Sequence, residues 1–87
     1  MMKKWLAIAA LLSSLSVNAA PVNINTADAK LIAASLRGVG IARAEEIVKY
    51  RSEYGDFQTL NDLRKVRGVG HRIVEKNRQD ILLTDPS

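Results

Sequence analysis

The sequence predicts an all-α domain of four to five short helices preceded by a signal peptide, and three observations point to it. No window alternates apolar and polar residues convincingly over the length of a strand. Apolar residues recur instead at helical spacing. The tetrapeptide Arg-Gly-Val-Gly occurs at residues 37–40 and again at residues 67–70, and the two copies contain four of the five glycines. Each copy lies between two predicted helices, so the order helix, tetrapeptide, helix occurs twice.

Residues 1–19 have the three-part order of a secretory signal peptide. Two lysines precede an apolar stretch at residues 5–12, and small polar residues follow it. Val17 and Ala19 satisfy the small-residue rule, which places cleavage after Ala19. The apolar stretch is far shorter than the roughly 20 residues of a spanning helix, which argues against a membrane anchor. We therefore expect export to the periplasm without a stable membrane anchor.

Charge and cysteine content restrict the function. The chain has 13 Lys and Arg, 9 Asp and Glu, and no cysteine. Without the two lysines of the signal peptide, 11 basic residues face the same 9 acids, and the net charge is +2. A diffuse attraction for polyanions is therefore disfavoured, and local geometry has to contribute to any binding of nucleic acid. Disulfides and a lipid anchor on cysteine are excluded.

A domain is predicted at residues 27–83, after an extended lead-in at residues 20–26. Its first helix is predicted over residues 27–36. Either Asn25 or Thr26 can cap it, because each side chain can accept a hydrogen bond from the free amides of the first turn. Asp28 adds a favourable negative charge there.

A longer helix is predicted over residues 41–54, because its apolar residues form one stripe and Gly55 is a natural stop. The aromatic residues Tyr50, Tyr54 and Phe57 can stack on nucleic-acid bases in principle. Their spacing beside the apolar stripe favours core packing instead.

The second half of the domain begins with a Thr-x-x-Asp helix start signal at residues 59–62, followed by a short helix. A last helix is predicted at residues 71–78. Residues 81–83 either pack or trail, and residues 84–87 are expected to fray. Neither half buries much alone, so the two are expected to share one core of roughly sixty residues, a size that is feasible without cross-links.

The repeated tetrapeptides form what we call the first hairpin (residues 37–40) and the second hairpin (residues 67–70). Glycine adopts positive φ readily, whereas other residues lose on the order of 1–3 kcal/mol there. The valine of each copy can point into the core and leave the glycine amides exposed. With the free amides of the following helix they form an anion site. A plain loop is the alternative for one copy, but two copies followed by basic residues favour phosphate binding.

The segments LRGVGIARAEEIV and LRKVRGVGHRIVEKN resemble the helix-hairpin-helix motif. The opening VNINTADA, the middle YRSEYGDFQTLNDL and the tandem layout are similar to the competence protein ComEA family. The resemblance covers nearly all of the chain after the signal peptide. It implies a tandem helix-hairpin-helix domain that binds double-stranded DNA without sequence preference. It also implies a periplasmic receptor that retains incoming DNA during uptake in natural transformation.

The resemblance assigns phosphate binding to both hairpins and to one arginine after each. The predicted set is Gly38, Val39, Gly40, Arg43, Gly68, Val69, Gly70 and Arg72. Five basic residues near the hairpins are expected as secondary DNA contacts, namely Arg37, Arg67, Lys65, His71 and Lys76. Asn77 and His71 stand where the first copy has Ile47 and Ile41, so the two hairpins are expected to differ in affinity.

The other charged residues are expected to form a solvated face with helical ion pairs. The basic members are Lys49, Arg51, Arg64 and Arg78, together with Lys65 and Lys76, and the acids are Glu45, Glu46, Glu53 and Glu75. A single histidine and the lack of cysteine argue against a metal or catalytic site, and no cofactor is predicted. Some relatives of the motif hold a monovalent cation on hairpin carbonyls, which nothing in this sequence demonstrates.

Two other classes of function remain as alternatives. The same fold can serve as an exported protein-interaction or scaffold module without DNA binding. The motif also occurs inside glycosylases and nucleases, but the sequence offers no nucleophile–base pair, so no enzyme is predicted. An inner-membrane DNA uptake channel and further copies of the chain along DNA are partners that the sequence leaves open.

Overall fold

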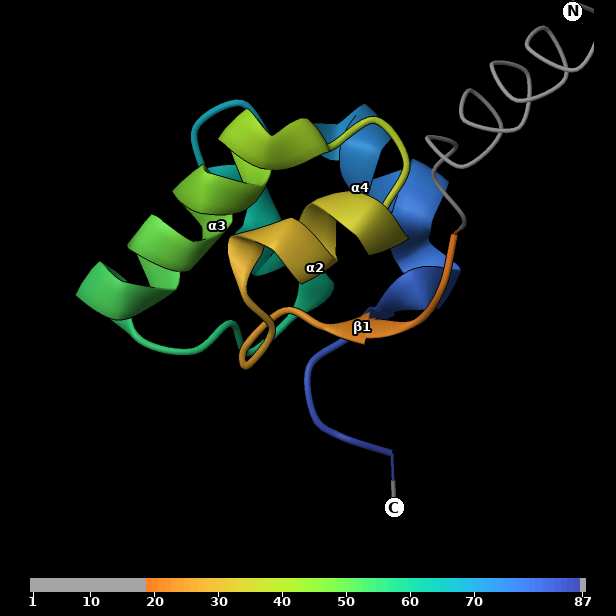
Figure 1. The fold of residues 1–87 in the computed structure, drawn as a ribbon. Helices are drawn as coiled ribbons and strands as arrows, with labels where there is room; N and C mark the ends of the chain where they lie inside the picture. The colour runs from red at the N-terminus through yellow and green to blue at the C-terminus, as the bar shows by residue number, and fades with distance from the viewer. Residues whose placement is uncertain (1–18, 87) are drawn as a thin grey trace, which may run out of the picture.

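The computed structural model describes residues 19–86. The predicted signal peptide lies, up to residue 18, outside the described residues. The elements follow in the order β1 (Val22–Asn23), α2 (Ala29–Ser35), α3 (Gly40–Tyr54), the 3₁₀ helix η1 (Leu60–Lys65), α4 (His71–Asn77), the 3₁₀ helix η2 (Arg78–Asp80) and β2 (Ile81–Leu82). Figure 1 shows α2 beside α3, with β1 passing below them. The all-α prediction is confirmed, with one very small strand pair added to it.

The first helix starts later than predicted. Asp28 caps α2, and its side chain accepts a hydrogen bond from the Leu31 amide at 2.8 Å. The predicted caps, Asn25 or Thr26, are wrong. The Asn25 side chain instead contacts the segment before η1, where its Oδ1 accepts from the Phe57 amide at 2.7 Å and its Nδ2 donates to the Phe57 carbonyl at 3.0 Å.

The predicted Thr-x-x-Asp start signal is confirmed at η1. The Thr59 hydroxyl accepts from the Asp62 amide at 3.2 Å, and the Asp62 carboxylate accepts from the Thr59 amide at 3.2 Å. The Gln58 amide also donates to this carboxylate, at 3.0 Å, and is the main cause that lowers the pKa of Asp62. The helix is of 3₁₀ type and ends at Lys65.

A parallel strand pair joins the two ends of the domain. Val22 pairs with Ile81 and Asn23 with Leu82. Asn23 Nδ2 also donates to Asp85 Oδ1 at 2.9 Å. The sequence does not reveal these strands, because two residues are too few for an alternating pattern. Of the two options for residues 81–83, packing is correct.

One hydrophobic core lies between the helices and the strand pair. Its members are Val22, Ile24, Ala27, Ile32, Leu36, Val39, Ala44, Ile47, Phe57, Leu63, Val66, Val69, Val74 and Ile81. The prediction of core packing is correct for Phe57, which is 2% exposed, and Tyr50 is half-buried against it. It is wrong for Tyr54, which is 71% exposed. The aromatic residues near the end of α3 therefore range from buried Phe57 through half-buried Tyr50 to exposed Tyr54.

Arg51 has a structural role that the sequence analysis missed. Its Nη1 donates to the carbonyls of Ile24, at 2.7 Å, and Ala27, at 2.6 Å. The prediction that Arg51 belongs to a solvated, ion-paired face is wrong. The guanidinium instead attaches α3 to the chain segment that precedes α2. None of the helices within residues 19–86 is long and apolar enough to cross a membrane.

Candidate nucleic-acid interface

The two hairpins differ in backbone conformation. In the first hairpin, Gly38 has a φ of 73° and Gly40 a φ of 66°. In the second hairpin, Gly68 has a φ of 88°, but Gly70 has a φ of −103°, which any residue can adopt. Positive φ at both glycines, which favours glycine at these positions, therefore occurs in the first hairpin only. The helix after the second hairpin also starts one position later in the repeat, at His71.

Both hairpins expose their glycines and bury their valines. Val39 is 1% exposed and Val69 is 3% exposed, in agreement with the expected inward orientation. Neither α3 nor α4 has a side-chain cap on its first amides. Within residues 19–86, no hydrogen bond to another protein group occupies the amide of any of the four hairpin glycines. These amides are therefore free to donate to an anion.

Arg43 connects the two hairpins. It lies in the first turn of α3, after the first hairpin, but its Nε donates to the carbonyl of Gly68 in the second hairpin at 2.8 Å. A Cβ on Gly68 would lie 3.5 Å from Arg43 Cγ, so the arginine side chain packs over this glycine. The other N–H groups of the guanidinium stay available for a phosphate. Arg43 thus holds the hairpins close together while remaining exposed to ligand.

Asn77 forms a second connection, from α4 to the first hairpin. Its side chain is 1% exposed. Its Oδ1 accepts from the Arg37 amide at 2.7 Å, and its Nδ2 donates to the carbonyls of Arg37 at 2.8 Å and Ile73 at 2.9 Å. The sequence alone shows only that Asn77 stands where the first copy has the apolar Ile47. A polar residue at a core position of a repeat is the signal that could have revealed this role.

Lys76 lies beside the first hairpin. Its Nζ is 3.7 Å from the position that a Cβ would occupy on Gly38. Lys76 and Arg37 line the same hollow, of about 370 Å³, next to Arg78. Arg78 is paired with Glu75, with Nε–Oε2 at 2.7 Å and Nη2–Oε1 at 3.0 Å. This contact raises the pKa of Arg78 and lowers that of Glu75. Neither Lys76 nor Arg37 forms an ion pair in the described chain.

The remaining predicted contacts lie at or near the second hairpin. Arg67, His71 and Arg72 are exposed, and Arg72 forms no ion pair within the described residues. Lys65 is also exposed, with its Nζ 3.4 Å from Asp62 Oδ1. The structure therefore places every predicted basic contact on the surface, around two hairpins that Arg43 connects.

The predicted network of helical ion pairs is largely wrong. Glu75 pairs with Arg78 as expected, but Glu45, Glu46 and Glu53 form no ion pair within the described part of the chain. These exposed or half-buried carboxylates stay available to repel or select ligands along α3.

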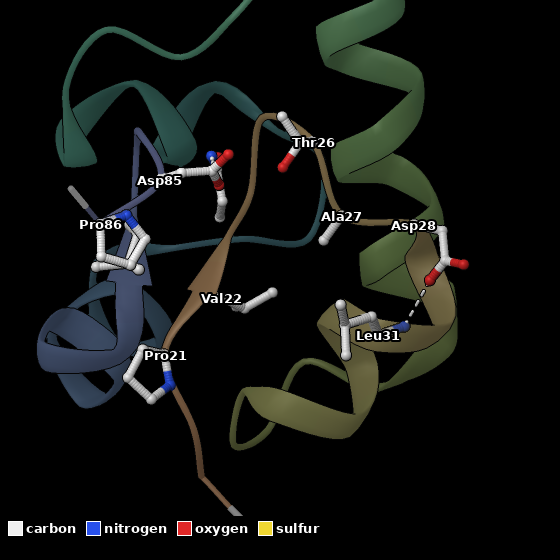
Figure 2. A pocket seen from close by; sticks show the side chains of 10 residues that line it. Pro21, Val22, Thr26, Ala27, Asp28, Leu31, Asp85 and Pro86 are labelled. Carbon is white, nitrogen blue, oxygen red and sulfur yellow. Dashed lines mark hydrogen bonds between the residues drawn. The ribbon is translucent and has the colours of Figure 1, made fainter.

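A groove of about 520 Å³ lies away from both hairpins, between β1 and the start of α2. Figure 2 shows Val22, Ala27 and Leu31 around it, with Asp28 and Asp85 at its sides. Among the residues that the structure describes, these two aspartates are its only ionisable lining residues. An acidic, partly apolar groove does not suit the phosphate backbone, so we assign it no part in the interface.

Comparison with known families identifies the repeated unit. A family model described as the helix-hairpin-helix motif matches residues 17–82, which include both hairpins and all the helices described above. The chain belongs to the helix-hairpin-helix family. The family accounts for the shared form of the two hairpins, whereas the Arg43 and Asn77 contacts explain how this helix-hairpin-helix domain holds them together.

Three relatives extend the comparison. An uncharacterized protein of Haemophilus influenzae is 46% identical over 61 residues, which are 70% of this chain and 54% of that protein. ComE operon protein 1 of Bacillus subtilis is 45% identical over 60 residues, covering 69% of this chain and 29% of that protein. Endonuclease/exonuclease/phosphatase family domain-containing protein 1 of Xenopus laevis is 35% identical over 65 residues, which are 75% of this chain and 12% of that protein.

The relation to ComE operon protein 1 confirms the resemblance to the competence protein ComEA family. The helix-hairpin-helix chain spans about half the length of the Haemophilus relative and a much smaller share of the other two. The activities of those whole proteins are therefore not transferred with the domain.

Proposed function

We propose that this helix-hairpin-helix protein binds double-stranded DNA without sequence preference and without catalysis. We further propose that it is exported and retains DNA in the periplasm during natural transformation. The family match and the relative named ComE operon protein 1 support DNA binding in competence. The nuclease-family name belongs to a relative of which this chain spans only 12%, so it carries little weight for an enzyme.

The observation that carries the proposal is the connection between the hairpins. The Arg43 Nε–Gly68 carbonyl bond of 2.8 Å links the first turn of α3, which follows the first hairpin, to the second hairpin. The free amides of each hairpin can hold one phosphate, and the guanidinium can add charge-assisted hydrogen bonds. Contacts of this kind position a protein on DNA but carry no sequence information. Binding to any duplex is the expected result.

A salt titration of duplex binding tests this proposal. If about three to five phosphates are neutralised, log K falls with log salt at a slope of roughly −3 to −4.5. Arg72→Ala should reduce this slope by about 0.9, since one phosphate contact is lost. Lys30→Ala removes the same charge from an exposed position on α2 and should leave the slope nearly unchanged. A flat salt response, or binding to one sequence only, contradicts the proposal, and no duplex binding at all favours the scaffold function.

The proposed export has a separate test. Deleting residues 1–19 should keep the protein in the cytoplasm, whereas the intact chain should be recovered from the periplasm without those residues. Recovery of the deletion variant from the periplasm would contradict the signal-peptide assignment.

A further inference from the structure

We propose that the exposed ring of Tyr54 is a stacking site for an unpaired base of single-stranded DNA adjoining the second hairpin. This inference rests on the proposed function, because it uses a phosphate held at that hairpin. It extends the interface from duplex DNA to single strands and to duplex ends with overhangs. The site lies in what we call the tyrosine groove, about 250 Å³ in volume, which is lined by α3, by Lys65 of η1 and by Arg67, the first residue of the second hairpin.

Three aromatic rings lead from the core to this groove. Phe57 is buried, and its ring stacks on that of Tyr50 with centroids 5.4 Å apart and planes 13° apart. Tyr50 in turn contacts Tyr54, with centroids 4.6 Å apart and planes at 39°. The outermost ring is anchored through its neighbours, yet Tyr54 remains 71% exposed. A held aromatic face at the surface loses little conformational freedom when a base stacks on it.

Basic and acidic side chains both line the groove, so it offers partners for a phosphate and for the polar edge of a base. Arg67, directly before Gly68, lines the groove with Lys49 and Lys65. These three cations can guide a backbone away from the second hairpin. The carboxylates of Glu46 and Glu53 also line it. They disfavour phosphates nearby but can accept hydrogen bonds from the amino groups of bases.

The groove has the length for a short strand. Its lining residues on α3 run from Glu46 to Tyr54. At a rise of about 1.5 Å per residue, they span about 12 Å along the helix. One strand of B-DNA advances about 3.4 Å per nucleotide, so this length corresponds to about three stacked nucleotides of a strand that lies along the groove. Bases inside a duplex are paired and stacked on their neighbours, whereas an unpaired base in an overhang has a free face for Tyr54.

Three DNA probes and two variants test the inference. The probes are a blunt duplex, the same duplex with a short single-stranded overhang, and that overhang in abasic form. The wild-type protein should bind the base-bearing overhang more tightly than the abasic one. Tyr54→Leu should remove about 5- to 10-fold of affinity for the base-bearing overhang, as expected for the loss of one stacked base. It should leave blunt-duplex affinity unchanged.

Tyr54→Phe is the matched control, because it keeps the ring and should bind all probes like the wild type. Since no charge is removed, the factor lost in Tyr54→Leu should stay constant across salt concentrations, unlike the factor lost in Arg72→Ala. Circular dichroism checks that both variants keep their helices.

The outcomes separate this inference from the proposed function. If the wild type binds the blunt duplex but Tyr54→Leu matches it on every probe, the stacking site is refuted and duplex binding stands. If the wild type fails to bind the blunt duplex but shows Tyr54-dependent binding of the overhang, the duplex function is refuted and the stacking site stands.

Discussion

Replacing Asn77 with alanine tests whether the buried amide holds the first hairpin in place. The substitution removes three hydrogen bonds, two of them to the Arg37 main chain and one to the Ile73 carbonyl. A typical intramolecular hydrogen bond contributes about 0.5–1.5 kcal/mol, and a buried polar group left without a partner costs about 1–3 kcal/mol. Water can reach the exposed hairpin and recover part of this loss. We therefore expect unfolding free energy to fall by about 2–3 kcal/mol.

Urea unfolding followed by circular dichroism measures this loss, and duplex binding is measured on the same samples. Affinity should also fall, because the Arg37 main chain no longer fixes the glycine amides that follow it. Asn61→Ala is the matched control, since Asn61 is exposed and its side chain bonds, within residues 19–86, only to the Arg64 side chain at 3.3 Å. The control should stay within about 0.5 kcal/mol of the wild type. If Asn77→Ala does the same, the amide does not hold the hairpin.

Three further predictions concern the conformation of the hairpin glycines, the Arg43 connection and the Asp62 carboxylate. Gly68→Ala should lower the unfolding free energy by about 1 kcal/mol or more, because Gly68 has a positive φ. Gly70→Ala should be tolerated, because the φ of Gly70 is −103° and no atom lies within 4 Å of an added Cβ. Equal losses of stability in urea would contradict the conformational difference between the hairpins. Arg43→Lys keeps the charge but loses the Nε bond to the second hairpin, so duplex affinity should fall while the salt slope changes little; wild-type affinity would show that the connection is not needed. The lowered pKa of Asp62 means that its carboxylate stabilises the fold above the ordinary carboxyl pKa near 4. This contribution should be lost as pH falls through the lower folded-state pKa, and Asp62→Asn should abolish that part of the pH dependence; an unchanged pH profile of unfolding would refute it.

The sequence was most informative where local chemistry decides the structure. The repeated glycines predicted the turns, Gly55 predicted the end of α3, and the Thr-x-x-Asp signal predicted the start of η1. In each case a residue acts on its immediate neighbours. Such effects can be read from spacing alone.

Long-range contacts were not predictable in this way. Asn25 was expected as a cap but bonds to Phe57, 32 residues away. Arg51 was expected in solvent but bonds to carbonyls 24 and 27 residues earlier. The partners of these side chains are distant in the sequence and become close only when the chain folds.

The candidate site shows the same division. The sequence indicated the hairpins and the basic residues, and the structure shows how Arg43 and Asn77 cross from one repeat to the other. It also shows Tyr54 at the surface, although its position beside the apolar stripe, four residues after Tyr50, predicts core packing. That spacing is compatible with a ring pair whose outer member remains exposed.

The most direct test of the interface follows the backbone amides of the isotope-labelled protein by NMR while unlabelled duplex DNA is added. Phosphate binding at the hairpins predicts that the amides of Gly38, Gly40, Gly68 and Gly70 shift most, and that they shift for duplexes of unrelated sequence. If these four resonances stay unchanged while those around the groove of Figure 2 move, DNA binds elsewhere and the hairpins are not its site.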